Sequence, residues 1–237
     1  MKLRCRISPQ EREEEEKRIK SEKEKIARMK DARPFIKFTG KIIYHTDLID
    51  IALISDNLLE KASVSSDSFV IGFDMEWPFS FKTGPGKTAT IQLSCDELTC
   101  YIFHVSQIKN LPKSLSELLV HPNVKLIGNN IKNDIRKLAR DFKGFDGDKI
   151  VNNCLDLGVL ANSILSRSER WSLEKLVDQL LDLKIDKDKK VRNSQWHVIP
   201  LSKRQKEYAA TDSYASILLY QTLKNREIEM NSCISSI

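Results

Sequence analysis

Long apolar segments are missing from this chain. No apolar run reaches the roughly 18 residues that a membrane-spanning helix needs, so we expect no membrane span and no membrane partner. The N-terminal residues Met1 to Arg6 also lack the apolar stretch of a secretory signal. With 237 residues and 41% hydrophobic content, the chain can nevertheless bury a full core, most simply as one domain with extensions.

Cysteine is scarce and has no regular spacing. The five cysteines are odd in number and form no C-x-x-C pair. This pattern disfavours a disulfide framework or a zinc site and favours free thiols inside a cell. The net charge is +6 and the pI is about 9.0, which favours a polyanionic partner without identifying it.

A phosphate-binding loop is also absent. Gly84-Pro85-Gly86-Lys87-Thr88 has a suitable composition but not the G-x-x-x-x-G-K-[ST] spacing. It also lies in a predicted hairpin, whereas such loops connect a strand to a helix. We therefore do not expect a nucleoside triphosphate to bind here.

Two carboxylates follow directly on a predicted core strand. Asp74 and Glu76 come after Ser68-Phe69-Val70-Ile71-Gly72, an apolar and β-branched run. On a strand, side chains two residues apart point to the same face about 7 Å apart, with Met75 on the other face. Like charges held together in this way favour a bound cation between them. For the pair alone, the alternative is an ordinary strand end before a turn at Pro78.

Two later stretches carry further polar groups. Tyr208 and Asp212 are four residues apart in a helical pattern, so a phenol and a carboxylate share one helix face. Asp134 lies near the start of another predicted helix, after the apolar strand Val124 to Ile127. There it would also be stabilised by the helix dipole alone. Asp156 is predicted to cap a helix and not to bind metal.

The ordered set of motifs resembles the DEDD 3′-5′ exonucleases, in particular the subgroup with tyrosine in the third motif and its Werner-type members. The similar segments are Phe73-Asp74-Met75-Glu76-Trp77-Pro78, Ala89 to Leu93, Tyr101 to Val105, Trp171-Ser172-Leu173 and Tyr208 to Ala215. The resemblance implies an α/β fold of the RNase H type, in which an antiparallel meander and parallel strands form one mixed sheet flanked by helices. It also implies release of nucleoside 5′-monophosphates from a 3′ end.

The same resemblance implies catalytic roles for Asp74, Glu76, Asp134, Tyr208 and Asp212. The four acidic residues would bind two ions of Mg²⁺ or Mn²⁺, because ligation by oxygen alone suits these hard cations. Asp74 would bridge the ions, and Asp134 would be an outer ligand or would bind the second ion. Since a phenol has a pKa near 10, Tyr208 is expected to orient the attacking water.

Seven residues are predicted to contact the substrate. Residues 184–206 contain eight basic and two acidic side chains, so a basic surface is expected close to the acidic site. Arg136 stands where Werner-type relatives have an aromatic residue, which suggests a different handling of duplex ends. The predicted substrate-binding residues are Met75, Trp77, Leu93, Arg136, Lys189, Lys190 and Arg192, although core packing is an equal alternative for Met75, Trp77 and Leu93.

The domain boundaries follow from composition. Residues 1–33 are predicted to be a charged extension, helical or disordered, since residues 10–31 hold eight acidic and eight basic side chains. Residues 34–223 form the predicted exonuclease domain, and residues 224–237 a tail. Because little chain follows Asp212, we expect no attached helicase.

The expected substrate is DNA, single-stranded or duplex with a recessed or overhanging 3′ end, in nuclear repair or replication. An RNase D-like exoribonuclease and an inactive nucleic-acid-binding adaptor are the alternatives, and the sequence specifies no protein partner. Retention of all four acidic residues and the tyrosine argues against the inactive adaptor.

Overall fold

The computed structural model describes residues 9–144 and 146–234, and its centre is a six-stranded mixed sheet in the order β1-β6-β5-β2-β7-β8. Strands β2, β5 and β6 pair antiparallel as a meander, whereas β1, β7 and β8 pair parallel to their neighbours. The predicted α/β class and mixed sheet are therefore confirmed. The strands are Lys41–His45 (β1), Phe69–Glu76 (β2), Thr90–Ser94 (β5), Thr99–His104 (β6), Val124–Gly128 (β7) and Cys154–Asp156 (β8).

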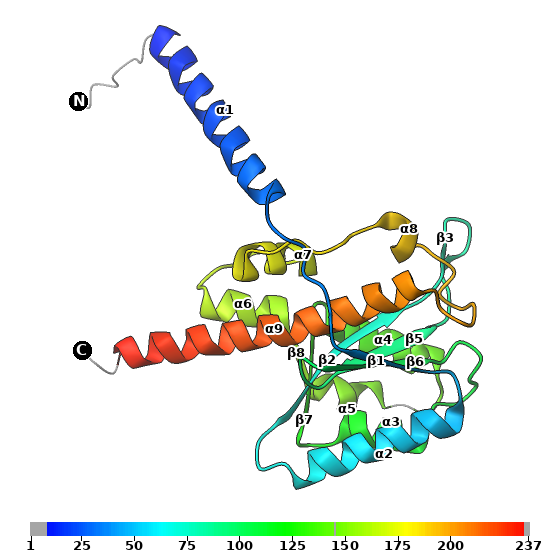
Figure 1. Cartoon of the computed structure of the whole chain (residues 1–237). Helices are drawn as coiled ribbons and strands as arrows, with labels where there is room; N and C mark the ends of the chain where they lie inside the picture. The colour runs from blue at the N-terminus through cyan, green and yellow to red at the C-terminus, as the bar shows by residue number, and fades with distance from the viewer. Residues whose placement is uncertain (1–8, 145, 235–237) are drawn as a thin grey trace.

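Helices cover both faces of the sheet (Figure 1). One face packs on α2 (Leu48–Val64), α3 (Lys113–Val120), α4 (Ile131–Asp141) and α5 (Gly147–Asn152), and together they enclose one apolar core. The other face packs on α9 (Lys203–Ile234), with α6 (Leu157–Ile164) and α7 (Leu173–Leu176) beside it. The π-helical turn Val177–Leu181 continues α7, and the short helix α8 (Lys189–Arg192) precedes α9.

The contact between β2 and α9 requires a glycine. A Cβ atom on Gly72 would lie 2.3 Å from the carbonyl oxygen of Ser213, closer than real Cβ atoms approach. Ser213 is also held from the sheet side, since its Oγ lies 2.9 Å from Oγ of Ser94. A side chain at position 72 would therefore push α9 away from the strand that carries Asp74 and Glu76.

A small hairpin follows β2. Strands β3 (Phe79–Ser80) and β4 (Gly84–Pro85) pair antiparallel, and Gly84 has φ of 78°, a left-handed conformation that glycine adopts without strain. The glycine-rich segment that resembled a phosphate loop is therefore part of a hairpin, as predicted from its sequence. It does not connect a strand to a helix.

The N-terminal helix α1 (Pro9–Asp31) projects away from the sheet and its covering helices (Figure 1). Its base is fixed by Lys30, whose Nζ lies 2.8 Å from Oδ2 of Asp178, and by ion pairs from Arg33 to Asp178 and Asp182. At the other end of the chain, α9 continues past Leu223. Of the predicted N-terminal extension, the structure describes residues 9–33, and of the predicted C-terminal tail it describes residues 224–234. The remaining residues of both segments lie outside the described part of the chain.

The described part of the chain contains four of the five cysteines and all of the assigned helices. Cys95, Cys100, Cys154 and Cys233 are all free thiols, while Cys5 lies outside that part. No helix within residues 9–144 and 146–234 is both long and apolar enough to cross a bilayer.

Candidate active site

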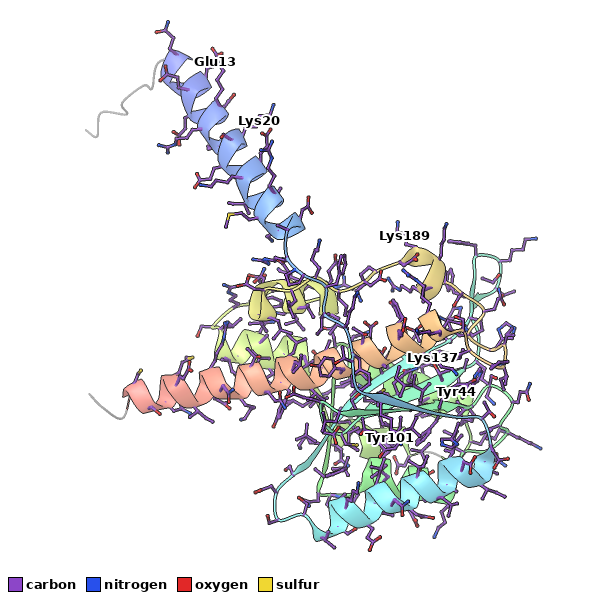
Figure 2. All side chains as sticks on the ribbon, viewed as in Figure 1. Glu13, Lys20, Tyr44, Tyr101, Lys137 and Lys189 are labelled. Carbon is purple, nitrogen blue, oxygen red and sulfur yellow. The ribbon has the colours of Figure 1, made fainter. Side chains whose placement is uncertain are left out.

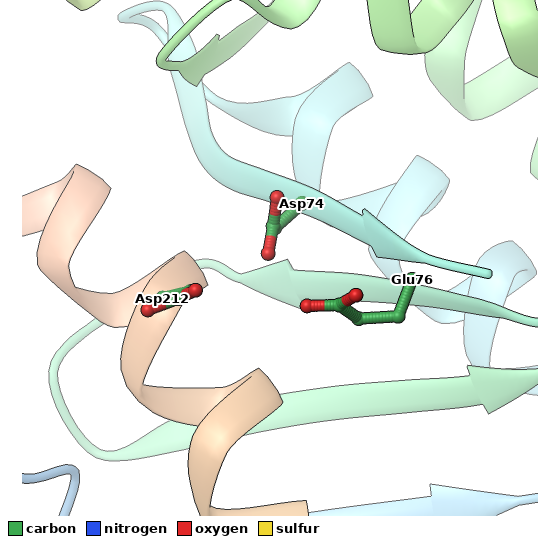
Figure 3. A group of neighbouring side chains, drawn as sticks. All are labelled: Asp74, Glu76 and Asp212. Carbon is green, nitrogen blue, oxygen red and sulfur yellow. The ribbon is translucent and has the colours of Figure 1, made fainter. Parts of the chain in front are cut away.

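Three carboxylates meet where β2 ends. Asp74 and Glu76 point to the same side of the strand, and Asp212 reaches them from α9 (Figure 3). One oxygen from each residue lies within 4.8 Å of the others. The register of β2 with β5, which pairs Asp74 with Gln92 and Glu76 with Thr90, places this group beside the centre of the sheet.

Burial and mutual repulsion disfavour charge on this group. Burial raises the pKa of Asp74 well above its usual value, and the charges of Asp212 and Asp134 raise it further. Burial, then the charges of Asp74 and Asp212, raise the pKa of Glu76 in the same way. Burial also raises the pKa of Asp212 to about 6, although Lys187, Tyr208 and Arg192 oppose the change. The protein therefore concentrates negative charge at a point that needs a counter-cation.

Asp134 lies in the same cavity but outside the group of three. It is in the first turn of α4, and burial together with the charge of Asp156 raises its pKa to about 7. Asp156 itself caps α6, since its Oδ1 accepts hydrogen bonds from the backbone N–H groups of Gly158 and Val159 at 2.9 and 3.1 Å. The prediction that Asp156 is an N-cap is confirmed.

Tyr208 lies one helical turn before Asp212 and is 8% exposed. Burial, followed by the charges of Asp212, Glu76 and Asp74, raises the pKa of its phenol above the usual value of 10. A phenol with such a pKa stays neutral at physiological pH and can donate a hydrogen bond. Its position therefore suits orientation of a water molecule better than removal of a proton.

The acidic group lies in an open cavity of about 790 Å³. The predicted substrate-binding residues that line it are Met75, Trp77, Lys189 and Arg192, and Figure 2 shows Lys189 on α8. Met75 is also part of the core, with only 3% exposure. All five predicted catalytic residues reach the cavity as well.

Three predicted substrate-binding residues do not line this cavity. Leu93 is fully buried, because β5 lies between β6 and β2 and is covered on both faces. This corrects the prediction that Leu93 contacts the terminal nucleotide. Arg136 and Lys190 are exposed on α4 and α8, and neither is among the residues that line the cavity.

The cavity lining also includes residues that were not among the predicted contacts, and Lys187, Phe79 and Phe81 are three of them. Lys187 places its Nζ 3.8 Å from Oδ2 of Asp212, and it lies within the basic stretch whose charge was noted from sequence. Phe79 and Phe81 line the cavity from the β3–β4 hairpin with their rings 5.3 Å apart, and Phe81 is 95% exposed. The sequence could have indicated this aromatic wall, because both phenylalanines follow within five residues of Glu76.

The donor set fits hard divalent cations. The group supplies carboxylate oxygens from three residues, and Oδ1 of Asp212 is buried without a hydrogen-bond partner among the described residues. Mg²⁺ and Mn²⁺ prefer such oxygen ligands, whereas zinc sites use histidine and cysteine more often. Asp74, Glu76 and Asp212 would therefore hold a cation, and Asp134 is available in the same cavity.

A mixed sheet that brings carboxylates together beside basic and aromatic side chains is typical of phosphodiester-cleaving nucleases. A family model described as 3′-5′ exonuclease matches residues 49–227. Over 207 residues the chain is 47% identical to curated proteins named 3′-5′ exonuclease from Drosophila melanogaster and Drosophila yakuba. These matches cover 87% of this chain, and 58% and 57% of the two relatives. The chain thus belongs to the DEDD-type 3′-5′ exonuclease family and spans little more than half the length of these relatives.

Solved structures of low sequence identity share the fold. The EXO domain of Aedes aegypti Nibbler matches with a TM-score of 0.66 and 18% identity, covering 84% of this chain and 98% of that one. The catalytic core of RRP6 from Trypanosoma brucei gives 0.64 and 20%, covering 86% and 54%. Escherichia coli RNase D, an exoribonuclease involved in structured RNA processing, gives 0.62 and 20%, covering 79% and 45%.

Proposed function

We propose that this protein removes nucleotides one at a time from the 3′ end of DNA, as a Werner-type exonuclease using Mg²⁺ or Mn²⁺. The observation that carries the proposal is the meeting of Asp74, Glu76 and Asp212 within 4.8 Å in a cavity that Tyr208 also lines. We further propose a nuclear role in repair or replication, which imaging of the tagged protein would test.

Each wall of the cavity has a chemical role in this proposal. Lys189 and Arg192 attract the phosphates of the strand, and Trp77, Phe79 and Phe81 offer faces on which bases stack. The bound cations would supply an activated water and charge stabilisation for the leaving 3′-oxygen. Tyr208, as a neutral phenol, donates a hydrogen bond that orients the water. Lys187 offsets part of the negative charge near Asp212.

RNA is the second candidate substrate. The observation in its favour is the shared fold with RNase D and RRP6, at 20% identity in each case. The relatives at 47% identity carry names that specify a 3′-5′ polarity without a sugar. We place DNA first because the motif set resembles the Werner-type subgroup.

The test uses end-labelled DNA and RNA strands of the same sequence, each with Mg²⁺, Mn²⁺ or EDTA. We expect mononucleotides from DNA with either cation and none in EDTA. Asp74→Asn/Glu76→Gln keeps the side-chain shapes, removes both charges and should lower the rate at least about 10²-fold. Faster hydrolysis of RNA would favour the second candidate, and activity that persists in EDTA or in this variant would refute the metal-dependent mechanism.

A further inference from the structure

A buried lysine lies behind the aromatic part of the cavity wall. Lys137 on α4 is 8% exposed and lies in the interior of the domain (Figure 2). Its Nζ is 2.7 Å from Oδ2 of Asp141 and 2.6 Å from the carbonyl oxygen of Gly86. The same nitrogen lies 5.0 Å from the centre of the Trp77 ring, within the range of a cation–π interaction.

Asp141 extends this contact to the chain that follows the hairpin. Its Oδ2 also accepts hydrogen bonds from the backbone N–H and the Oγ1 hydroxyl of Thr88, both at 2.7 Å. Asp141 thus joins α4 to Thr88, while Lys137 joins it to Gly86. Burial opposes the charge on Asp141, but the hydrogen bonds from Lys137 and Thr88 outweigh it and lower its pKa.

The joined segment holds the backbone on both sides of Trp77. Gly86 N–H donates to the carbonyl of Pro78 at 2.8 Å, and Ala89 N–H donates to the carbonyl of Glu76 at 2.9 Å. Trp77 lies between these two bonded carbonyls and lines the cavity, whereas Lys137 and Asp141 do not line it. The ion pair therefore contacts the cavity wall at Trp77, and the charge of Lys137 also acts on Asp134, where it opposes the increase in pKa that burial causes.

We propose that Lys137 and Asp141 are positioning residues, which fix Trp77 so that the cavity receives the terminal nucleotide of the substrate. This inference rests on the proposed function, because it assigns Trp77 to the substrate. A buried ion pair adds little net stability, since loss of hydration offsets the attraction of the two charges. The effect of the pair on geometry can therefore be separated from its effect on folding.

A single and a double variant distinguish the effect of the ion pair on geometry from its effect on folding. Lys137→Met alone leaves the mostly buried Asp141 carboxylate unpaired and should destabilise the fold. Lys137→Met/Asp141→Asn removes both charges and keeps an oxygen that accepts from Thr88, so we expect this double variant to fold. The matched control is Lys113→Met/Glu117→Gln, which removes an exposed ion pair of the same i, i+4 spacing on α3.

Two measurements report on Trp77. With Mn²⁺, the double variant should raise KM for a single-stranded oligonucleotide roughly 5- to 100-fold, the range expected for one lost base stack, with kcat within about twofold. Bis(p-nitrophenyl) phosphate, which carries no base, should be hydrolysed as by the unaltered protein. Acrylamide quenching of tryptophan fluorescence should increase, because Trp77 is the only half-buried tryptophan beside the buried Trp171 and Trp196. Trp77→Phe in the same background should remove that increase.

Either an unchanged KM or unchanged quenching in a folded double variant would overturn the inference. So would an equal loss of activity on the oligonucleotide and on the small ester, since that would show damage to the acidic site. If the unaltered protein hydrolyses neither substrate, the proposed function fails, and binding of a fluorescent oligonucleotide in EDTA then decides the inference. Binding weakened roughly 5-fold or more in the double variant but not in the control would support it, and equal or absent binding would not.

Discussion

Without a bound cation, the negative charge of Asp212 lowers the stability of the folded protein. Its pKa is about 6 in the folded protein and about 3.8 in an unfolded chain, so the folded state keeps a proton that the unfolded state loses between these values. Stability is therefore lost as pH rises from about 4 to 6. We predict that Asp212→Asn stabilises the cation-free protein by about 1 to 3 kcal/mol at pH 7.5 and has little effect at pH 4.

Thermal unfolding in EDTA at several pH values would check this prediction. A Mn²⁺ titration provides the control, because the cation should raise Tm of the unaltered protein more than Tm of Asp212→Asn. If Asp212→Asn lowered Tm in EDTA at pH 7.5, the carboxylate would be stabilising the fold through other contacts. The argument that this site needs a counter-cation would then fail.

Helix α8 offers a comparison between two adjacent lysines of one element. Lys189 lines the cavity and Lys190 does not, although both are exposed and are neighbours in this four-residue helix. We predict that Lys189→Glu raises KM for a long DNA strand about tenfold, because it replaces a phosphate contact with a repelling charge. Lys190→Glu makes the same change of charge and should have a clearly smaller effect.

Steady-state kinetics at low and high salt would measure both lysine variants. The Lys189→Glu effect should shrink as salt rises, because ions screen the charge. Equal effects of the two variants would mean that the net charge of α8 matters and the position of each lysine does not. A dinucleotide substrate, which is too short to follow the basic wall, should be nearly insensitive to either change.

Sequence patterns predicted the strands and helices that carry the acidic residues more reliably than they predicted the other residues that line the cavity. The apolar run before Asp74, the helical spacing of Tyr208 and Asp212, and the strand before Asp134 are local signals, and each element formed as predicted. Leu93 was misassigned because its burial depends on which strands flank β5, and local sequence does not specify strand order. The ion pair between Lys187 and Asp212 joins residues 25 positions apart. Lys187 lies in a loop whose sequence has no periodic pattern, so local sequence could not predict this contact.

At the scale of the whole molecule, α1 and the domain are joined at one end of the helix only. Residues 10–31 hold equal numbers of acidic and basic side chains, and their described side chains are exposed. Removing residues 1–29 keeps the Lys30 and Arg33 ion pairs with Asp178. We predict that this truncation changes Tm by less than about 2 °C, because the described side chains it removes are exposed. We also expect KM for DNA to stay within about twofold, because residues 10–29 hold seven acidic and seven basic side chains and the only other charged side chains lost are Lys2, Arg4 and Arg6.

A slightly longer truncation provides the contrast. The arm after α1 crosses to α9, where Phe38 packs against Tyr214 with ring centres 5.3 Å apart and its N–H donates to Oγ1 of Thr211 at 3.2 Å. Ile36 and Phe38 are both buried, so removing residues 1–38 should cost about 3 to 5 kcal/mol of stability. Chemical denaturation of the two truncated proteins would measure the difference. If both lost stability equally, α1 would be part of the cooperative fold, and the domain would begin well before residue 34.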